Sequence, residues 1–309
     1  MSHDPLEGIY TALVTPFQED ESVDFDGVSR LVRDQVEAGI AGLVVGGSTG
    51  EFAAMSLQER EELAEHVITE SASSANIVVG LGSVRTADSI RLAEHALGQG
   101  AHSGLLVMPY YEPLSHTELV AFVSDVAAVG LPIMIYNNPG ATGETLTPEF
   151  LAELGHISNV VGVKDTTPEP HRLFAIDTAS GQLDVFSGHD TSTIFAFLSG
   201  RKAAIWGAPN VHPHACVALW RLAVQNKDVE ASLELWKSFY HLNAFMESHS
   251  YVASAKAGAN LRGVGVGRPR RPIAPLSEAD REHLGSLIAT VDETLERLGQ
   301  ASVRVGSRT

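Results

Sequence analysis

The sequence predicts an α/β protein in which eight strand–helix units close into a (β/α)8 TIM barrel, followed by a C-terminal helical extension. Short apolar runs alternate with amphipathic helical patterns over the first two thirds of the 309 residues. Most runs lack the polar–apolar alternation of a half-exposed strand, which is typical of parallel strands covered on both faces. Eight such units in succession favour a closed barrel, and a doubly wound sheet is the alternative.

The expected strands leave room between them for one helix and two loops, as a parallel crossover requires. Each is a short run rich in Val, Ile and Leu, and several end in glycine, proline or a polar residue. They span residues 9–17, 42–47, 76–82, 103–111, 131–139, 159–165, 183–190 and 202–210.

Three of the intervening segments carry clear helix signals. Residues 24–39 place four apolar side chains on one stripe, which is the pattern of a helix with one buried face: Val28, Leu31, Val32 and Val36. Residues 56–71 begin with Ser56 and Glu59, which have the spacing of a capping box. Residues 86–100 end in two glycines, which are suited to terminating a helix.

The chain divides into a barrel and an appended helical part. Residues 1–210 contain the eight strands and are expected to form the (β/α)8 barrel. Residues 211–300 show helical patterns with a break at "GVGVGRPRRPIAP", and we expect a helical extension packed on the barrel. Residues 301–309 are expected to be a frayed tail.

Composition excludes several classes of partner. The 21 basic and 38 acidic residues give a net charge of −17, which argues against nucleic acid or an anionic membrane surface. No apolar run approaches the ~18 residues of a membrane span, and the N-terminus does not have the pattern of a signal peptide. The single cysteine, Cys216, rules out an internal disulfide and fits a reducing compartment. We therefore expect a cytoplasmic protein.

The segment "NVVGVKDTT", residues 159–167, carries a lysine to the tip of a core strand. A buried ammonium group is costly unless it is paired or has lost its proton. Lys164 is therefore either a structural cation, which is the commoner role of such a residue, or a reactive group. Enzymes built on barrels carry out their chemistry at the C-terminal ends of the strands, where this lysine stands.

The other strand ends supply hydroxyl groups and glycines, with few titratable groups. The candidates are Gly47, Ser48 and Thr49 in "GGSTGE", Tyr110 and Tyr111 in "PYY", Tyr136 after the fifth run, and Gly188 and Asp190 after the seventh. Taken singly, these could be an ordinary tight turn and ordinary aromatic packing. The 13 histidines fit no metal-ligand spacing, and there is no P-loop or dinucleotide motif. We therefore expect no metal and no cofactor.

Together these groups predict one kind of chemistry. A desolvated lysine amine is a nucleophile toward a carbonyl group, and the resulting iminium weakens the neighbouring carbon–carbon bond. A tyrosine can carry the proton, while Ser and Thr hydroxyls with loop amides can hold a carboxylate. The sequence predicts a metal-free Schiff-base lyase that acts on pyruvate or another 2-oxo acid.

The chain resembles the dihydrodipicolinate synthase/N-acetylneuraminate lyase family of class I aldolases over residues from about 8 to 280. The motifs that carry the resemblance are "GSTGE", "PYY", "YNNPGATG", "GVKD" and "SAKAGANLRGVGVGRPRRPIAPLSEAD". The resemblance implies that Lys164 forms the imine and that Tyr136 is the acid/base. It also implies that Ser48 and Thr49 hold the carboxylate, and that Ser48 relays protons with Tyr136.

Two further features follow only from the resemblance. Tyr111 matches the tyrosine that family members insert into the active site of a neighbouring subunit, so that a homotetramer built as a dimer of dimers is implied. Ile205 matches a residue whose backbone carbonyl lines the substrate pocket.

The departures from the family pattern concern the second substrate. Ala141 stands where dihydrodipicolinate synthases carry an arginine that holds the carboxylate of aspartate semialdehyde. Thr191 and Gly207 stand where sialic acid lyases carry Glu and Ser. Aldolases of 2-keto-3-deoxygluconate share the Ala-Thr-Gly segment, which favours a hydroxylated aldehyde as substrate. The alternatives are 4-hydroxy-tetrahydrodipicolinate synthase, a keto-deoxy sugar acid dehydratase, and a barrel without catalytic activity that binds a ligand.

Overall fold

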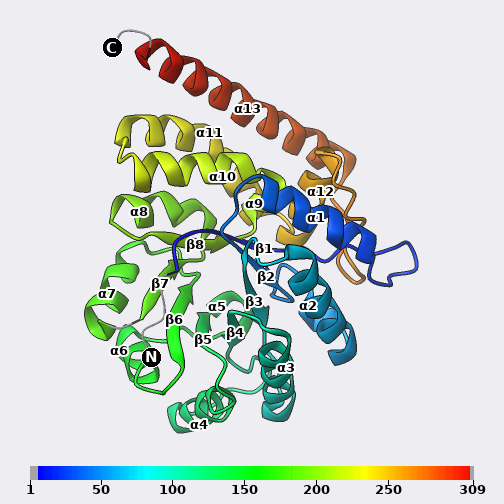
Figure 1. Cartoon of the computed structure of the whole chain (residues 1–309), viewed down its shortest axis with the longest axis vertical. Coiled ribbons are helices and arrows are strands. Elements are labelled where there is room, and N and C mark those ends of the chain that lie inside the picture. The colour runs from blue at the N-terminus through cyan, green and yellow to red at the C-terminus, as the bar shows by residue number, and fades with distance from the viewer. Residues whose placement is uncertain (1–5, 182, 307–309) are drawn as a thin grey trace.

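The computed structural model describes residues 6–181 and 183–306, and it is a closed barrel of eight parallel strands (Figure 1). The strands are β1 (Gly8–Ala12), β2 (Gly42–Val45), β3 (Asn76–Gly80), β4 (Ser103–Val107), β5 (Ile133–Asn137), β6 (Val160–Asp165), β7 (Asp184–Ser187) and β8 (Ala203–Trp206). Each strand pairs with the next, and β1 also pairs with β8. The predicted barrel is confirmed, and the doubly wound alternative is wrong, because β1 has a strand on each side.

Helices cover the outside of the barrel and extend beyond it (Figure 1). Within the described residues, the α-helices are α1 (Phe25–Glu37), α2 (Leu57–Ser71), α3 (Thr86–Gln99), α4 (His116–Ala127), α5 (Pro139–Thr142), α6 (Pro148–Leu154), α7 (His171–Ser180), α8 (Thr193–Leu198), α9 (Ala208–Val211), α10 (Pro213–Trp220), α11 (Val229–Ser248), α12 (Tyr251–Leu261) and α13 (Glu278–Gly306). The shorter turns are η1 (Phe52–Ala54) and η2 (Asp190–Ser192), which are 3-10 helices, and η3 (Arg221–Gln225), which is a π-helix.

Most of the predicted helix signals have their expected geometry, although Gly98, expected at the end of a helix, lies inside α3. The hydroxyl of Ser56 accepts a hydrogen bond from the Glu59 amide, and the Glu59 carboxylate accepts one from the Ser56 amide, so α2 begins with a capping box. Gly39 and Gly100 have φ values of +87° and +83°, where a residue without a Cβ terminates a helix at little cost.

The strands are shorter than the apolar runs that predicted them. The run 103–111 continues past the end of β4 at Val107. Its next residues include Pro109, which has no N–H to donate to a neighbouring strand. The chain therefore leaves the sheet there, and the aromatic pair that follows stands in a loop above the barrel.

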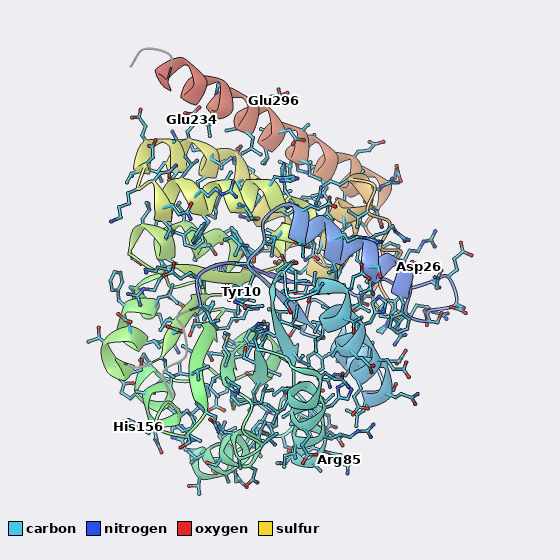
Figure 2. All side chains as sticks on the ribbon, in the orientation of Figure 1. Tyr10, Asp26, Arg85, His156, Glu234 and Glu296 are labelled. Atoms are coloured by element: carbon cyan, nitrogen blue, oxygen red, sulfur yellow. The ribbon has the colours of Figure 1, made fainter. Side chains whose placement is uncertain are left out.

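Apolar side chains fill most of the inside of the barrel. Tyr10, near the centre of the molecule in Figure 2, packs edge-on against Phe186 with ring centroids 5.7 Å apart. A Cβ on Gly42 would lie 2.1 Å from the Tyr10 ring, so this position needs glycine. The inward layer contains Tyr10, Ala12, Val44, Val78, Leu105, Val107, Met134, Tyr136, Phe186, Ala203 and Ile205.

The C-terminal part is helical, with the expected break before α13. α11 packs against α13, and α12 lies against α9 and α13. The sequence placed the boundary after residue 210, but α10 contacts β1 and so belongs with the helices around the barrel. The tail was expected from residue 301, whereas α13 remains helical to Gly306, continuing a helix whose inner face buries Leu284 and Val291. Residues 307–309 of the expected tail lie outside the described residues. Within the described ranges, no helix is both long and apolar enough to span a membrane.

Candidate active site

Lys164 and Tyr136 lie side by side at the carboxyl end of the barrel. Strand pairing sets Tyr136 of β5 opposite Lys164 of β6, and both side chains are directed into the barrel. Lys164 is 5% exposed, and its Nζ lies 4.3 Å from the centroid of the Tyr136 ring. Among the described residues, no carboxylate lies within 4.0 Å of this amine. The lysine is thus buried against an aromatic face, without the ion pair that a structural cation would have.

Glycine at position 188 makes room for this lysine. A Cβ on Gly188 would lie 2.7 Å from Lys164 Cε and 2.7 Å from Thr166 Cγ2. The backbone is held in place by a hydrogen bond from the Gly188 amide to the carbonyl of Asp165, 2.8 Å long. The loop after β7 therefore packs directly on the methylene stem of Lys164 and limits where its amine can lie.

The carboxylate of Asp165 is tied into a network on the other side of β6. It accepts hydrogen bonds from Asn137 Nδ2 at 2.8 Å and from the Thr167 amide at 2.9 Å. It also pairs with Arg172 Nε at 3.0 Å. Because its charge is already balanced by these partners, Asp165 fixes the end of the strand and is not available to neutralise Lys164.

The phenol of Tyr136 has a polar partner that the sequence did not identify. Its oxygen accepts a hydrogen bond from Asn138 Nδ2 at 3.0 Å, and the residue is only 6% exposed. The signal for Asn138 lies in the segment "YNNP", where the second asparagine follows the tyrosine by two positions. Within the described residues, no hydrogen bond joins Ser48 to Tyr136, so their proton relay stays a prediction.

The loop after β2 presents Ser48 and Thr49 above the barrel. The Gly50 amide donates to the Gly47 carbonyl at 3.0 Å, and the Glu51 amide donates to the Ser48 carbonyl at 3.1 Å, which makes a tight double turn. Glycine is required below this loop, because a Cβ on residue 80 would lie 2.0 Å from the carbonyl oxygen of residue 46. The predicted turn is present, and it is stacked closely on β3.

Asp190 is buried, and its carboxylate is bonded to the C-terminal extension. Tyr251 of α12 donates its hydroxyl hydrogen to Asp190 Oδ2 at 2.6 Å, and the same hydroxyl oxygen accepts from the Gly207 amide at 2.8 Å. A Cβ on Gly207 would lie 2.6 Å from the Tyr251 oxygen, so this network depends on glycine there. Burial raises the pKa of Asp190 to about 7, against the lowering effects of the Tyr251 hydrogen bond and the Lys164 charge.

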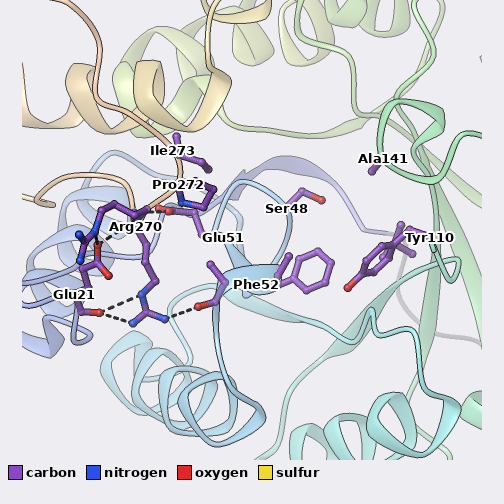
Figure 3. Close-up of a pocket in the computed structure, with 13 residues that line it drawn as sticks. Glu21, Ser48, Glu51, Phe52, Tyr110, Ala141, Arg270, Pro272 and Ile273 are labelled. Carbon is purple, nitrogen blue, oxygen red and sulfur yellow. Dashed lines mark hydrogen bonds and ion pairs between the residues drawn. The ribbon is translucent and has the colours of Figure 1, made fainter.

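A pocket of about 560 Å³ opens between the barrel loops and the segment before α13 (Figure 3). Its lining is mostly apolar and consists of Glu21, Ser48, Glu51, Phe52, Ala53, Ala54, Val107, Tyr110, Ala141, Arg270, Arg271, Pro272 and Ile273. Ser48, Tyr110 and Ala141 are the predicted site residues that line it. Lys164 and Tyr136 are buried in the barrel. Ile205 is fully buried in β8, level with Tyr10 in the neighbouring strand.

The two tyrosines of "PYY" have different environments. Tyr110 lines the pocket, and its ring centroid lies 6.0 Å from that of Phe52. Tyr111 is 82% exposed. An exposed aromatic ring next to a pocket is consistent with contact to another molecule, and the insertion of Tyr111 into a second subunit stays a prediction.

The arrangement defines a class of protein: a (β/α)8 barrel lyase of the class I aldolase type, with its lysine at the end of β6. The chain belongs to the dihydrodipicolinate synthetase family, whose model matches residues 5–291. The family resemblance found in the sequence motifs is therefore confirmed.

Curated relatives and solved structures agree with this family. The chain is 37% identical to a 4-hydroxy-tetrahydrodipicolinate synthase of Xanthomonas axonopodis, covering 92% of this chain and 94% of the relative. It is 32% identical to an N-acetylneuraminate lyase of Rhizobium meliloti, covering 93% and 95%. A prophage protein of the dihydrodipicolinic acid synthase family from E. coli, solved in complex with pyruvate, superposes with a TM-score of 0.88 at 27% identity, covering 93% of this chain and 98% of that one.

Proposed function

We propose that the protein is a Schiff-base lyase that joins or splits pyruvate, or a closely related 2-oxo acid, and a hydroxylated aldehyde. The observation that carries the proposal is the placement of Lys164, buried against the Tyr136 ring without a carboxylate partner among the described residues. A buried amine with no ion pair is suited to nucleophilic attack on a carbonyl. The pyruvate-bound E. coli relative supports the 2-oxo acid.

In the proposed reaction, the Lys164 amine attacks the 2-oxo carbon, and loss of water gives an iminium. The iminium loses a proton from C3 to form an enamine, whose carbon attacks the aldehyde carbon. The new alkoxide takes up a proton, and water then hydrolyses the imine to release the product and free the amine. The Tyr136 phenol, oriented by Asn138, carries these protons. Ser48, Thr49 and the Gly47 loop hold the carboxylate, and the reverse sequence cleaves the bond.

Ala141 supports the choice of aldehyde. It lines the pocket on α5 and offers no charge to a second carboxylate. Arg270 and Arg271 also line the pocket, but each pairs with a glutamate, Glu59 at 2.7 Å and Glu21 at 2.6 Å respectively. With its cations already engaged, the pocket suits a neutral aldehyde.

The second candidate is 4-hydroxy-tetrahydrodipicolinate synthase, which uses pyruvate and aspartate semialdehyde. It is favoured by relatives of that name, including those from Xanthomonas axonopodis and Methanospirillum hungatei. A keto-deoxy sugar acid dehydratase would use the same imine to expel a β-hydroxyl group. These activities share the Lys164 imine and differ in the carbon substrate, whereas a non-catalytic barrel would form no imine.

We also propose that the protein works in the cytoplasm as a homotetramer, in which Tyr111 completes the site of a neighbouring subunit. The exposure of Tyr111 beside the pocket supports this assembly. A Tyr111→Ala variant should then lose most of its activity and keep its secondary structure. Full activity of that variant, or of a monomer in sedimentation, would refute the shared site.

The proposed function is tested by reduction with borohydride in the presence of pyruvate, followed by intact-mass measurement. We expect a stable covalent adduct, which no binding protein of this fold would give. Steady-state cleavage and condensation assays with glyceraldehyde, aspartate semialdehyde and a keto-deoxy sugar acid then separate the candidates. An aldolase releases pyruvate from the sugar acid, and a dehydratase consumes the sugar acid without releasing pyruvate.

A further inference from the structure

A second buried lysine lies behind the pocket, in the C-terminal extension. Lys256 of α12 is 1% exposed, and its Nζ lies 2.7 Å from Oε1 of Glu51, which is equally buried. The ammonium also donates to the Arg268 carbonyl at 2.8 Å and stands 4.2 Å above the Phe17 ring. Burial lowers its pKa to about 8, although the Glu51 charge acts in the opposite direction.

Glu51 is the residue that follows the Ser48–Thr49 turn, and its backbone is unusual. Its φ of +61° lies in the left-handed region, which a residue with a side chain occupies only when its surroundings hold it there. The carboxylate provides that hold. Oε1 pairs with Lys256, and Oε2 accepts a hydrogen bond from the Arg270 amide at 2.7 Å.

The pair therefore joins three segments that are distant in sequence: the loop after β2, helix α12 and the segment 268–273. Figure 3 shows Glu51 and Arg270, the two residues of these contacts that line the pocket. A buried ion pair is a weak source of stability, because removing two charges from water offsets most of their attraction. The pair lies next to the turn at residues 46–51, which is proposed to bind the substrate carboxylate and in which Glu51 has a positive φ. This location points to a role in positioning that turn.

We propose that Lys256 and Glu51 are a positioning pair, through which the C-terminal extension sets Ser48 and Thr49 for the carboxylate of the 2-oxo acid. The inference rests on the proposed function for its substrate. The inference adds that the C-terminal extension positions residues of the active site, in addition to packing on the barrel.

The path from the pair to the hydroxyls is short. The Glu51 amide donates to the Ser48 carbonyl, so a movement of Glu51 is transmitted to Ser48 through one hydrogen bond. On the other side of the turn, the Thr15 hydroxyl donates to the Gly50 carbonyl at 2.6 Å. The turn is thus held at two points, by the barrel through Thr15 and by the extension through Glu51.

The decisive variant removes both charges together, E51Q with K256M, because the single change K256M leaves an unpaired carboxylate in the core. The control is D34N with R262M, which breaks the ion pair between helix α1 and the residue that follows α12 and does not involve residues 46–51. Both full-length double variants are compared with the wild type in two measurements: amide hydrogen exchange at residues 46–51 without substrate, and the pyruvate concentration that gives half-maximal borohydride trapping.

We expect exchange at residues 46–51 to rise by about tenfold or more in E51Q/K256M. The half-maximal pyruvate concentration should rise about tenfold, with the yield at saturating pyruvate kept within about twofold. The control should match the wild type in both. Unchanged exchange in E51Q/K256M, an equal change in the control, or failure of E51Q/K256M to fold would overturn the positioning role. Because exchange is measured without substrate, it judges the pair even if the wild type gives no pyruvate adduct and the proposed function fails.

Discussion

The two buried lysines of this protein show how surroundings give one side chain two different uses. Lys256 is held by a carboxylate at 2.7 Å, a backbone carbonyl and an aromatic face. Lys164 has an aromatic face at 4.3 Å and a glycine packed on its stem, with no carboxylate in range among the described residues. Both ammonium groups contact an aromatic ring, so the two lysines differ in whether a carboxylate is paired with them. A paired lysine holds structure, and an unpaired one is available for chemistry.

The largest expected effect comes from removing each lysine in turn and measuring turnover. Lys164→Met should lower kcat by roughly 10³-fold or more, because the covalent step loses its nucleophile. Lys256→Met should retain imine formation at high pyruvate concentration, because its amine does not touch the substrate. Comparable catalytic losses in the two folded variants would break the distinction between them.

The same two substitutions should have the reverse order of effect on stability. Lys256→Met leaves Glu51 buried and unpaired, which should lower the free energy of unfolding by about 3–5 kcal/mol. Lys164→Met replaces an unpaired side chain by one of similar volume, and the change should stay within about 1.5 kcal/mol. Urea unfolding at neutral pH measures both values. A larger loss for Lys164→Met would mean that Lys164 is the structural cation.

Asp190 sharpens the comparison, because it is a buried acid near Lys164 that is already bonded to Tyr251. Its folded-state pKa of about 7 lies above the ordinary 3.8, so the folded protein binds more protons than the unfolded chain between these values. The stability contributed by this protonation is present at acid pH and is lost as pH rises toward 7. Asp190→Asn removes that dependence.

The Asp190→Asn variant should therefore gain stability relative to the wild type as pH rises from about 4 to 7, by a total on the order of 4 kcal/mol at most. Urea unfolding of both proteins across this range measures the difference. A parallel pH dependence of the two proteins would show that the folded-state pKa of Asp190 is not raised above its ordinary value.

The smallest expected effect concerns the pocket wall. Ala141→Arg adds a cation to the pocket wall. Arg270 and Arg271 are each paired with a glutamate, whereas the new side chain would be free to bind the carboxylate of the substrate. It should raise kcat/KM for aspartate semialdehyde relative to glyceraldehyde by about tenfold to a hundredfold, since a hydrogen bond to a charged group contributes about 1.5–3 kcal/mol. Steady-state kinetics with pyruvate fixed gives this ratio. If the unmodified protein already prefers the semialdehyde, the choice of a hydroxylated aldehyde is wrong.

The barrel and Lys164 could be predicted from sequence because their signals are local. Eight apolar runs with helices between them define the fold, and a lysine in a buried run such as "VVGVKD" stands out against its neighbours. The signals for helix ends are also local, as the capping box formed by Ser56 and Glu59 shows. The strands were predicted too long, because the apolar residues that mark a strand continue into the loop that follows it, as after β4.

The supporting contacts could not be predicted, because they join residues that only the folded chain brings together. Glu51 and Lys256 stand in two of the quoted motifs, "GSTGE" and "SAKAGANLRGVGVGRPRRPIAPLSEAD", but nothing in either motif indicates that the two side chains meet. Tyr251 and Asp190 are similarly far apart, and their contact depends on the missing Cβ of Gly207. Family motifs identified the groups proposed to touch substrate, whereas the contacts that hold these groups in place had no signal in the sequence.

The central claim is that the unpaired buried lysine, and not the paired one, forms the imine. Peptide mapping by mass spectrometry, after borohydride reduction of the wild-type protein with pyruvate, tests it directly. The account predicts one modified peptide that contains Lys164, with Lys256 and the other lysines unmodified. An adduct on Lys256 or on an exposed lysine, or no adduct at all at saturating pyruvate, would contradict it.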